Sequence, residues 1–179
     1  DDVILSSDSS EIIDVAKVFG LHAPFKRPDD LATDTSDSIS VMLHAWTHYP
    51  DYKYVALLQP TSPLRTSQDI DACFHKMHEC DAPACITVVQ AKQHPAWMVS
   101  VKSDGKIRSV FDPSTISTRR QDLNEAYVLN GAVYVAEFSW LARSKSFLNE
   151  DVVASVMPTE RSLDIDSEFD FKIFNALIS

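Results

Sequence analysis

Short apolar runs alternate with amphipathic stretches along the first half of the chain. Residues 2–5, 54–58 and 85–89 are apolar almost throughout, which is the pattern of strands covered on both faces of a parallel sheet. Between these runs, apolar residues recur every three or four positions, as in helices that bury one face. The repeated strand–helix order predicts an α/β fold with right-handed crossovers, and we expect residues 22–25 to add a further short strand.

The helices of this first half have recognisable starts. Ser9 or Ser10 is expected to cap the first one and Gly20 to end it. Ser67 is expected to cap the helix that precedes the apolar run at 85–89. The apolar stripe predicted to face inward on the first helix consists of Ile12, Val15, Ala16 and Phe19.

The pattern changes after Trp97. Residues 98–102 and 106–110 flank Ser103-Asp104-Gly105, which predicts a β-hairpin. Strands are then expected at 131–136 and 152–157, with a short helix between them. We interpret about 93–125 as an inserted arm or flap on a single nucleotidyltransferase domain that comprises residues 1–179.

An acidic stretch stands near the end of the chain. Asp164 and Asp166 alternate with Leu163 and Ile165, which predicts the end of a strand with both carboxylates on one face. Ser167 and Asp170 form a capping box that opens a final helix. The apolar stripe of that helix is Phe171, Phe174, Leu177 and Ile178.

Polar residues follow three of the predicted strands, at 6–8, 59–61 and 164–166. Because ligands of parallel sheets bind beyond the carboxyl ends of the strands, these residues are expected to line one rim. Two hard oxygen ligands at that rim suit Mg²⁺ carrying a phosphate substrate. The alternative is that the two aspartates merely solvate the outer face of an edge strand.

Composition narrows the function classes. The chain has 179 residues, 45% of them hydrophobic, and a formal net charge of -10, which argues against a protein that tracks a nucleic-acid backbone. No apolar window reaches the roughly 18 residues of a membrane span. Three cysteines without a framework predict reduced thiols and a cytoplasmic location. On a helix, Cys73 and Cys80 would face away from His75 and His78, so a zinc site is not expected there.

Five stretches, in this order along the chain, together indicate one protein family: residues 27–35, 57–66, 120–123, 130–134 and 162–166. Together they closely resemble the acylneuraminate cytidylyltransferases, or CMP-sialic acid synthetases, over nearly the whole chain. The resemblance implies a Rossmann-like, mostly parallel α/β sheet with helices on both faces and a small inserted hairpin that serves as a dimerisation arm. It also implies a Mg²⁺-dependent transfer of CMP from CTP to the anomeric hydroxyl of a nonulosonic (sialic-type) acid, with release of pyrophosphate.

The resemblance also assigns roles to matched positions. Asp164 and Asp166 would hold Mg²⁺ and, with Arg120, form the catalytic set. Arg27, Ser36 and Ser38 would bind the nucleotide. The sugar would be bound by Gln59, Arg120, Asn130 and Tyr134, with Arg120 directed to its carboxylate or to a phosphate across a homodimer.

Two departures from the family are visible. The family opens with a strand and a Gly-rich, basic loop, whereas this chain has three glycines and begins at what resembles the second strand. By that comparison it is N-terminally incomplete, so we expect weak or no CTP turnover from this chain alone and an exposed apolar edge beside its first strand. Trp97 stands where some members have a lysine. The alternatives are a cytidylyltransferase for another 3-deoxy sugar acid and a non-catalytic sugar-nucleotide-binding or dimerisation module.

Overall fold

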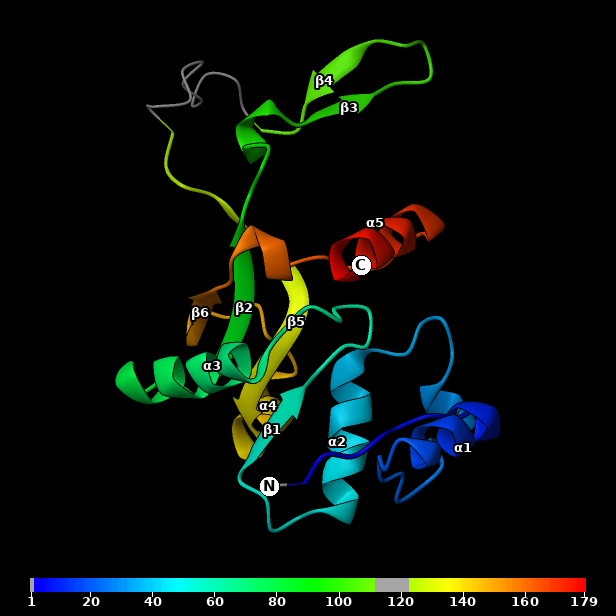
Figure 1. Cartoon of the computed structure of the whole chain (residues 1–179). Helices are drawn as coiled ribbons and strands as arrows, with labels where there is room; N and C mark the ends of the chain where they lie inside the picture. The colour runs from blue at the N-terminus through cyan, green and yellow to red at the C-terminus, as the bar shows by residue number, and fades with distance from the viewer. Residues whose placement is uncertain (1, 112–122) are drawn as a thin grey trace. The chain divides into compact units, whose positions relative to one another are not determined.

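The computed structural model describes residues 2–111 and 123–179 (Figure 1). Its four-stranded sheet has the strand order β1-β5-β2-β6, and a separate two-stranded sheet is formed by β3 and β4. The elements in chain order are α1 (Ser10–Val18), η1 (Asp29–Leu31), α2 (Ser38–His48), β1 (Tyr54–Leu57), α3 (Ser67–Glu79), β2 (Ala84–Gln90), η2 (Pro95–Trp97), β3 (Val99–Val101), β4 (Ile107–Ser109), β5 (Tyr127–Glu137), α4 (Phe138–Ser144), β6 (Val152–Val156), η5 (Thr159–Arg161) and α5 (Glu168–Ile178).

The chain divides into two compact units. Unit 1 contains the residues up to Leu57 together with Val135–Glu150, and unit 2 contains Leu58–Tyr134 and Asp151–Ser179. The division falls within β5, so this strand contributes its first part to unit 2 and its last residues to unit 1.

In unit 1, α2 packs against α4. The rings of Trp46 and Phe138 stack with centroids 5.1 Å apart, and Met42 on the same helix is buried. The two short strands expected at 2–5 and 22–25 are reduced to a single parallel bridge between Ile4 and His22. These contacts bury the inward face of α2 as its periodicity predicts.

The predicted inward face of α1 is wrong. Ser9 caps the helix as expected, its side chain accepting a hydrogen bond from the Ile12 amide. However, Ile12 is 54% exposed and Phe19 84% exposed, whereas Ile13 is the buried residue of the helix. A single bridge offers α1 far less surface than the predicted pair of strands, so most of its apolar stripe stays in contact with solvent.

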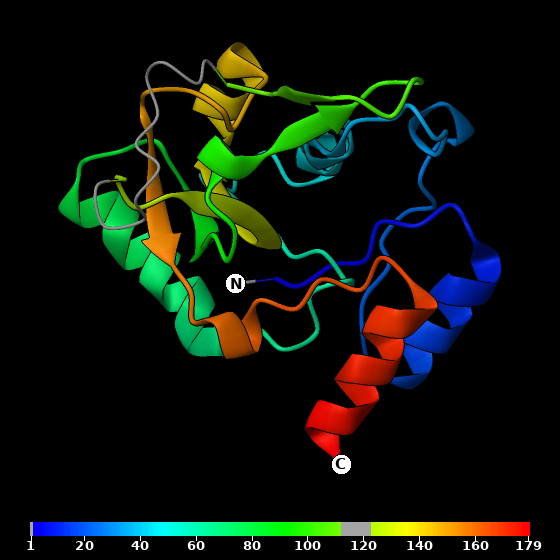
Figure 2. The same cartoon turned by 90° about the horizontal axis from the view of Figure 1, so that it is seen from above.

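In unit 2, α3 lies along β2 and β6 (Figures 1 and 2). Strands β2 and β6 are parallel, with Ala84 opposite Val152 and Val88 opposite Val156. Cys73 on α3 and Cys85 on β2 are buried free thiols. Thr87 joins β2 to β5, because its hydroxyl accepts from the Val133 amide at 2.9 Å and donates to the Val133 carbonyl at 3.2 Å. The core of this unit therefore sits between the sheet and α3.

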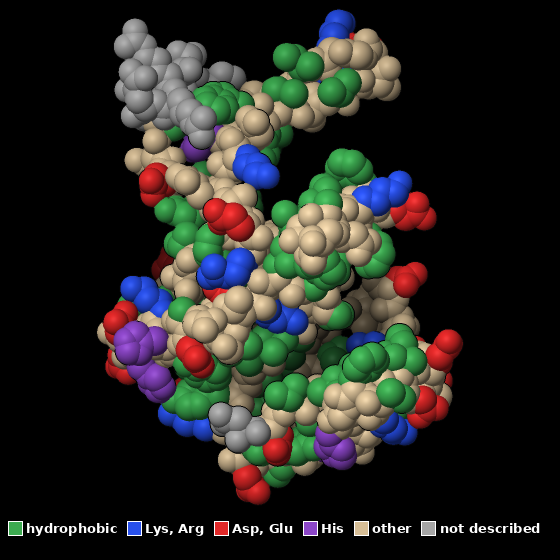
Figure 3. All heavy atoms as spheres, in the orientation of Figure 1, with side chains coloured by type: hydrophobic (Ala, Val, Ile, Leu, Met, Phe, Trp, Pro, Cys, Tyr) green, Lys and Arg blue, Asp and Glu red, His purple; other side chains and the backbone are tan. Residues whose placement is uncertain are grey.

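The predicted hairpin is confirmed. β3 and β4 pair antiparallel, and Gly105 occupies the turn with φ +82°. Val101 is 69% and Ile107 70% exposed, and Figure 3 shows hydrophobic side chains along this hairpin. The dimerisation role of the arm stays a prediction, and residues 112–122 of the arm lie outside the described part of the chain.

The C-terminal region departs from the prediction in one respect. Residues 162–166 do not form a strand: after β6 the chain makes the turn η5 and continues without ladder pairing. The capping box of α5 is confirmed, since the Ser167 amide donates to Asp170 Oδ2 at 2.9 Å and Ser167 Oγ accepts from the Asp170 amide. Its apolar stripe is largely uncovered, with Phe171 53% and Leu177 59% exposed. Within the described ranges no helix is long and apolar enough to span a membrane.

Candidate active site

Three side chains of unit 2 converge on one glycine of β5. Gly131 has φ +72°, and a Cβ added to it would lie 2.7 Å from Gln59 Oε1 and 3.5 Å from both Asp164 Oδ2 and Ser62 Oγ. A residue with a side chain would have to displace at least the Gln59 amide. The structure thus places Gln59 and Asp164, two predicted site residues, beside the backbone of the same glycine. An isolated glycine inside a predicted strand is a recognised signal of such a close approach.

The loop that carries Gln59 is fixed to β5. Arg65 Nη1 donates to the carbonyl oxygens of Gln59, at 2.6 Å, and of Ala132, at 2.9 Å. Burial lowers the pKa of Arg65 from its usual value. Ser62 is fully buried and donates to the Asn130 carbonyl at 3.3 Å. These hydrogen bonds give the loop a defined position beside β5.

Asn130, predicted to bind the sugar, is hydrogen-bonded within the protein. It is buried, and its amide nitrogen donates to Ser162 Oγ at 3.0 Å and to Met157 Sδ at 3.2 Å. Its Oδ1 accepts from the Ala132 amide at 3.2 Å. The amide nitrogen and the Oδ1 of Asn130 are thus both hydrogen-bonded within the protein, and its role in binding the sugar stays a prediction.

Asp164 presents an unsatisfied oxygen. Its Oδ1 is buried and has no hydrogen-bond partner among the described residues. The segment is held beside the Gln59 loop by the Ile165 amide, which donates to the Thr61 carbonyl at 2.8 Å. Asp166 is exposed. A buried, unpaired carboxylate oxygen is costly in a protein by itself, and such an atom is suited to a cation.

This donor set fits Mg²⁺ better than a metal held entirely by protein. In the described part of the chain, no group of three or more His, Cys, Asp or Glu side chains could enclose a metal. Mg²⁺ is commonly held by one or two carboxylates together with substrate phosphates and water. The oxygen chemistry of Asp164 and Asp166 therefore fits the expected cation, and convergence of both carboxylates on one ion stays a prediction.

Tyr134 belongs to the same region of β5. Burial raises the pKa of Tyr134 above its usual value, and the negative charge of Asp164 raises it further. The phenol is therefore protonated at neutral pH and can donate a hydrogen bond. Electrostatic coupling to Asp164 links this third predicted residue to the carboxylate.

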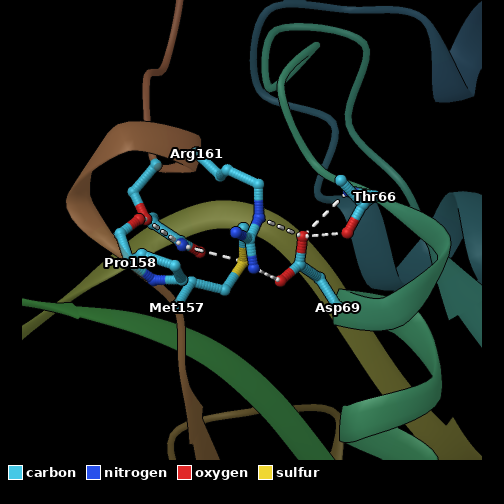
Figure 4. Close-up of polar contacts among 7 residues, drawn as sticks. Thr66, Asp69, Met157, Pro158 and Arg161 are labelled. Atoms are coloured by element: carbon cyan, nitrogen blue, oxygen red, sulfur yellow. Dashed lines mark hydrogen bonds and ion pairs between the residues drawn. The ribbon is translucent and has the colours of Figure 1, made fainter.

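An ion pair near the acidic segment was not anticipated from the sequence. Arg161 Nε donates to Asp69 Oδ2 at 3.0 Å and Arg161 Nη2 to Asp69 Oδ1 at 2.7 Å (Figure 4). Asp69 also closes a capping box with Thr66, which shows that the predicted cap, Ser67, is wrong by one residue. The sequence Thr66-x-x-Asp69 was a signal for this cap. Arg161 could not be assigned because its partner lies 92 positions away.

The Asp69 pair predicts a pH-dependent stability. Its hydrogen bond with Arg161 lowers the pKa of Asp69 below 3.8, so the stabilisation is complete above the unfolded-state pKa and is lost as pH falls through the folded-state value. Because Asp69→Asn removes a charged hydrogen-bond partner of Arg161 and Thr66, the variant should unfold at a lower denaturant concentration than the wild type at pH 7. Denaturant titrations from pH 7 to pH 3 should show the two proteins converging below pH 3.8. A constant difference across that range would contradict the assignment.

The predicted nucleotide-binding residues belong to unit 1. Arg27 Nη2 donates to Asp8 Oδ1 at 3.0 Å, which lowers the pKa of Asp8, while Arg27 Nε is buried without a hydrogen-bond partner in the described residues. Ser36 Oγ donates to the Asp30 carbonyl at 3.2 Å. Ser38 is the exposed first residue of α2. Arg120 lies outside the described residues, so its predicted role stays a prediction.

Comparison with known proteins finds a matching family model and similar sequences. A family model described as cytidylyltransferase matches residues 1–149. The chain is 33% identical over 172 residues to an N-acylneuraminate cytidylyltransferase of Escherichia coli O18:K1:H7, covering 96% of this chain and 40% of that protein. It is 30% identical over 185 residues to a CMP-N,N'-diacetyllegionaminic acid synthase of Legionella pneumophila, covering 99% of this chain and 78% of that protein. The chain thus spans less than half of the length of the first relative.

A solved structure of CMP:2-keto-3-deoxy-manno-octonic acid synthetase complexed with CTP shares the fold. The TM-score is 0.69 at 13% sequence identity, and the match covers 99% of this chain and 80% of that one. The predicted α/β, Rossmann-like fold class is therefore confirmed.

Proposed function

The chain belongs to the cytidylyltransferase family, and from this premise we propose that it transfers CMP from CTP to the anomeric hydroxyl of a nonulosonic (sialic-type) acid and releases pyrophosphate. The observation that carries the proposal is the meeting of Gln59, Asp164 and the bare backbone of Gly131. Relatives named for sialic and legionaminic acid activation support the choice of substrate class.

The reaction needs alignment and charge neutralisation above all. The anomeric hydroxyl must attack the α-phosphorus opposite the leaving pyrophosphate, so positioning the two substrates accounts for much of the rate. Asp164 and Asp166 would hold Mg²⁺, which, when bound, neutralises charge on the triphosphate. The buried and unpaired Oδ1 of Asp164 supports its part in this role.

The remaining roles concern the two substrates. The Gln59 amide would donate to or accept from the sugar's hydroxyl groups, and the protonated Tyr134 phenol would donate to an acidic or hydroxyl oxygen of the sugar. Arg27, Ser36 and Ser38 would contact the nucleotide, and Arg120 would face a carboxylate or phosphate. We further propose a cytoplasmic homodimer in which the arm at about 93–125 completes the neighbouring site.

The structural neighbour is the reason for a second candidate function with another substrate class. The structural neighbour is named for an eight-carbon acid, so a cytidylyltransferase acting on another 3-deoxy sugar acid is the alternative. Both readings require turnover, whereas a non-catalytic sugar-nucleotide-binding module would bind CTP without releasing pyrophosphate.

Pyrophosphate release distinguishes these functions. The full-length protein is incubated with CTP, Mg²⁺ and, in separate reactions, N-acetylneuraminic, legionaminic, pseudaminic or 3-deoxy-manno-octonic acid. We expect release that depends on a nine-carbon acid and stops when a chelator removes the metal. Turnover of the eight-carbon acid alone would favour the alternative enzyme. CTP binding without pyrophosphate release from any acid would contradict the enzymatic proposal.

A further inference from the structure

We propose that Arg161 and Asp69 are positioning residues for Asp164: their ion pair anchors the turn from which the acidic segment at 162–166 begins. The inference rests on the proposed function, because the segment matters through the carboxylate that it presents. Arg161 and Asp69 lie outside the group of side chains that converges on Gly131.

The geometry of the ion pair between Asp69 and Arg161 fixes both side chains in position. Both oxygens of Asp69 accept from Arg161, at 3.0 and 2.7 Å, and Oδ2 also accepts from the amide and hydroxyl of Thr66 at 2.8 Å each (Figure 4). The Asp69 side chain is 6% exposed and the Arg161 side chain 37%. A two-bond fork fixes orientation as well as distance. The end of η5 is thereby tied to the first turn of α3.

The acidic segment at 162–166 needs such an anchor because no strand pairing holds it in place. Residues 162–166 lack ladder pairing, and a segment with few backbone hydrogen bonds opens easily. Isolated hydrogen bonds restrain it as well: Asn130 Nδ2 donates to Ser162 Oγ at 3.0 Å, the Ile165 amide donates to the Thr61 carbonyl at 2.8 Å, and the Asp166 amide donates to Asp170 Oδ2 at 3.3 Å.

The ion pair is the restraint nearest to where the segment leaves η5. Asp164 follows Arg161 by three positions, so a shift of the turn would move the carboxylate. Ser162 Oγ also donates to the Pro158 carbonyl at 2.8 Å, which closes the same turn on itself. Because η5 is closed by this hydrogen bond and its end is bound to α3, the acidic segment leaves the turn in a fixed direction toward Gly131.

A purely stabilising role would not require this arrangement. Buried ion pairs are often replaced by apolar side chains without loss of stability, whereas groups that orient a metal ligand typically change affinity or activity about 10- to 100-fold when removed. The two roles therefore predict different measurements.

The test compares four single variants of the full-length protein. Arg161→Ala removes the fork, and Arg161→Lys keeps the charge but not the two-bond geometry. Lys76→Ala is the matched control, since it breaks an exposed ion pair with Glu79 on the same helix as Asp69. Met77→Ala is the stability control, because it removes a buried side chain of α3 without touching the pair.

Three quantities are measured on each variant: exchange of the Ile165 amide hydrogen by NMR, Mn²⁺ affinity by calorimetry, and kcat for CMP transfer. Arg161→Ala should speed Ile165 exchange at least about 10-fold and weaken Mn²⁺ binding about 10- to 100-fold, with Arg161→Lys intermediate. Lys76→Ala should match the wild type. Met77→Ala should change Ile165 exchange only as far as it lowers global stability.

The proposal is overturned if Ile165 exchange and Mn²⁺ affinity in Arg161→Ala stay at wild-type values or change only in proportion to stability, as in Met77→Ala. A wild-type protein that transfers no CMP would overturn the proposed function instead. In that case the exchange of Ile165 and the binding of Mn²⁺ still decide whether the pair positions the segment.

Discussion

Replacing Asp164 by asparagine is expected to lower kcat for CMP transfer about 100- to 1,000-fold, because removal of one group that stabilises transition-state charge has effects of this size. The same change should leave the free energy of unfolding unaltered or raise it by up to about 1 kcal/mol. The reason is that Asp164 Oδ1 is a buried oxygen without a hydrogen-bond partner among the described residues, and an unsatisfied buried polar atom is costly to the folded protein. Opposite changes in activity and stability are characteristic of a residue kept for function.

Pyrophosphate release at saturating substrates measures the first quantity, and denaturant unfolding without divalent cations measures the second. Asp71→Asn is the control, since Asp71 is an exposed carboxylate on α3 and should leave both quantities at wild-type values. If Asp164→Asn retained full activity, or if it lost stability and activity in parallel, the assignment of Asp164 as a metal ligand would be wrong.

Gly131→Ala should impair both folding and turnover. An alanine at φ +72° costs about 1–2 kcal/mol in backbone strain, and its Cβ would come within 2.7 Å of Gln59 Oε1. Since that oxygen belongs to a flexible side chain, the Gln59 amide is expected to move away from Asp164. We expect kcat/KM for the sugar acid to fall at least about 10-fold, as a displaced substrate contact would cause.

Gly20→Ala separates strain from crowding. Gly20 has a similar φ of +78°, but a Cβ there would meet nothing within 4 Å. It should therefore lose stability by a similar amount and keep its kcat/KM. A double variant gives an independent check: in a Gln59→Ala background, Gly131→Ala should add little further loss of turnover. Equal effects of the two glycine substitutions on kcat/KM would refute a role for the close contact.

Features that depend on neighbouring residues could be predicted from the sequence. The strand at β2, the hairpin turn at Gly105 and the capping box of Ser167 with Asp170 each depend on side chains within a few positions. The apolar run at 54–58 likewise predicted β1. In each case one local pattern favours one local structure, and the structure agrees.

Features that depend on distant partners could not be predicted. The alternation at 163–166 is typical of a strand, but a strand also needs a neighbour with free backbone groups, and this segment uses isolated contacts such as Ile165 to Thr61 instead. The apolar residues of α1 recur with the predicted helical period, but most of them face solvent. Which side of a helix is buried depends on the elements that pack against it. The pairing of Asp69 with Arg161 is invisible in a single sequence for the same reason.

The roles given to the candidate site residues stay predictions, but the structure shows which of these residues lie together. Gln59, Tyr134 and Asp164 were chosen from the resemblance to a family, and within unit 2 Gln59 and Asp164 meet at Gly131 while Tyr134 is coupled electrostatically to Asp164. Gly131 itself had no assigned role, although an unexplained glycine within a strand is a reason to look for a close neighbour. Asn130 was assigned to the sugar, and this role stays a prediction; its side chain is hydrogen-bonded to Ser162 and Met157.

The discontinuity of both units affects how the protein can be cut and made. The chain leaves unit 1 after Leu57, returns at Val135 and leaves again after Glu150. No single truncation can therefore isolate one unit from the other. A fragment that ends at residue 150 keeps unit 1 together with part of unit 2 but lacks β6 and the acidic segment, and one that begins at residue 58 keeps unit 2 with Val135–Glu150 of unit 1 still attached and lacks α2. During synthesis unit 2 cannot close until its last stretch has left the ribosome, so its folding is expected to follow translation of the whole segment rather than to proceed with it.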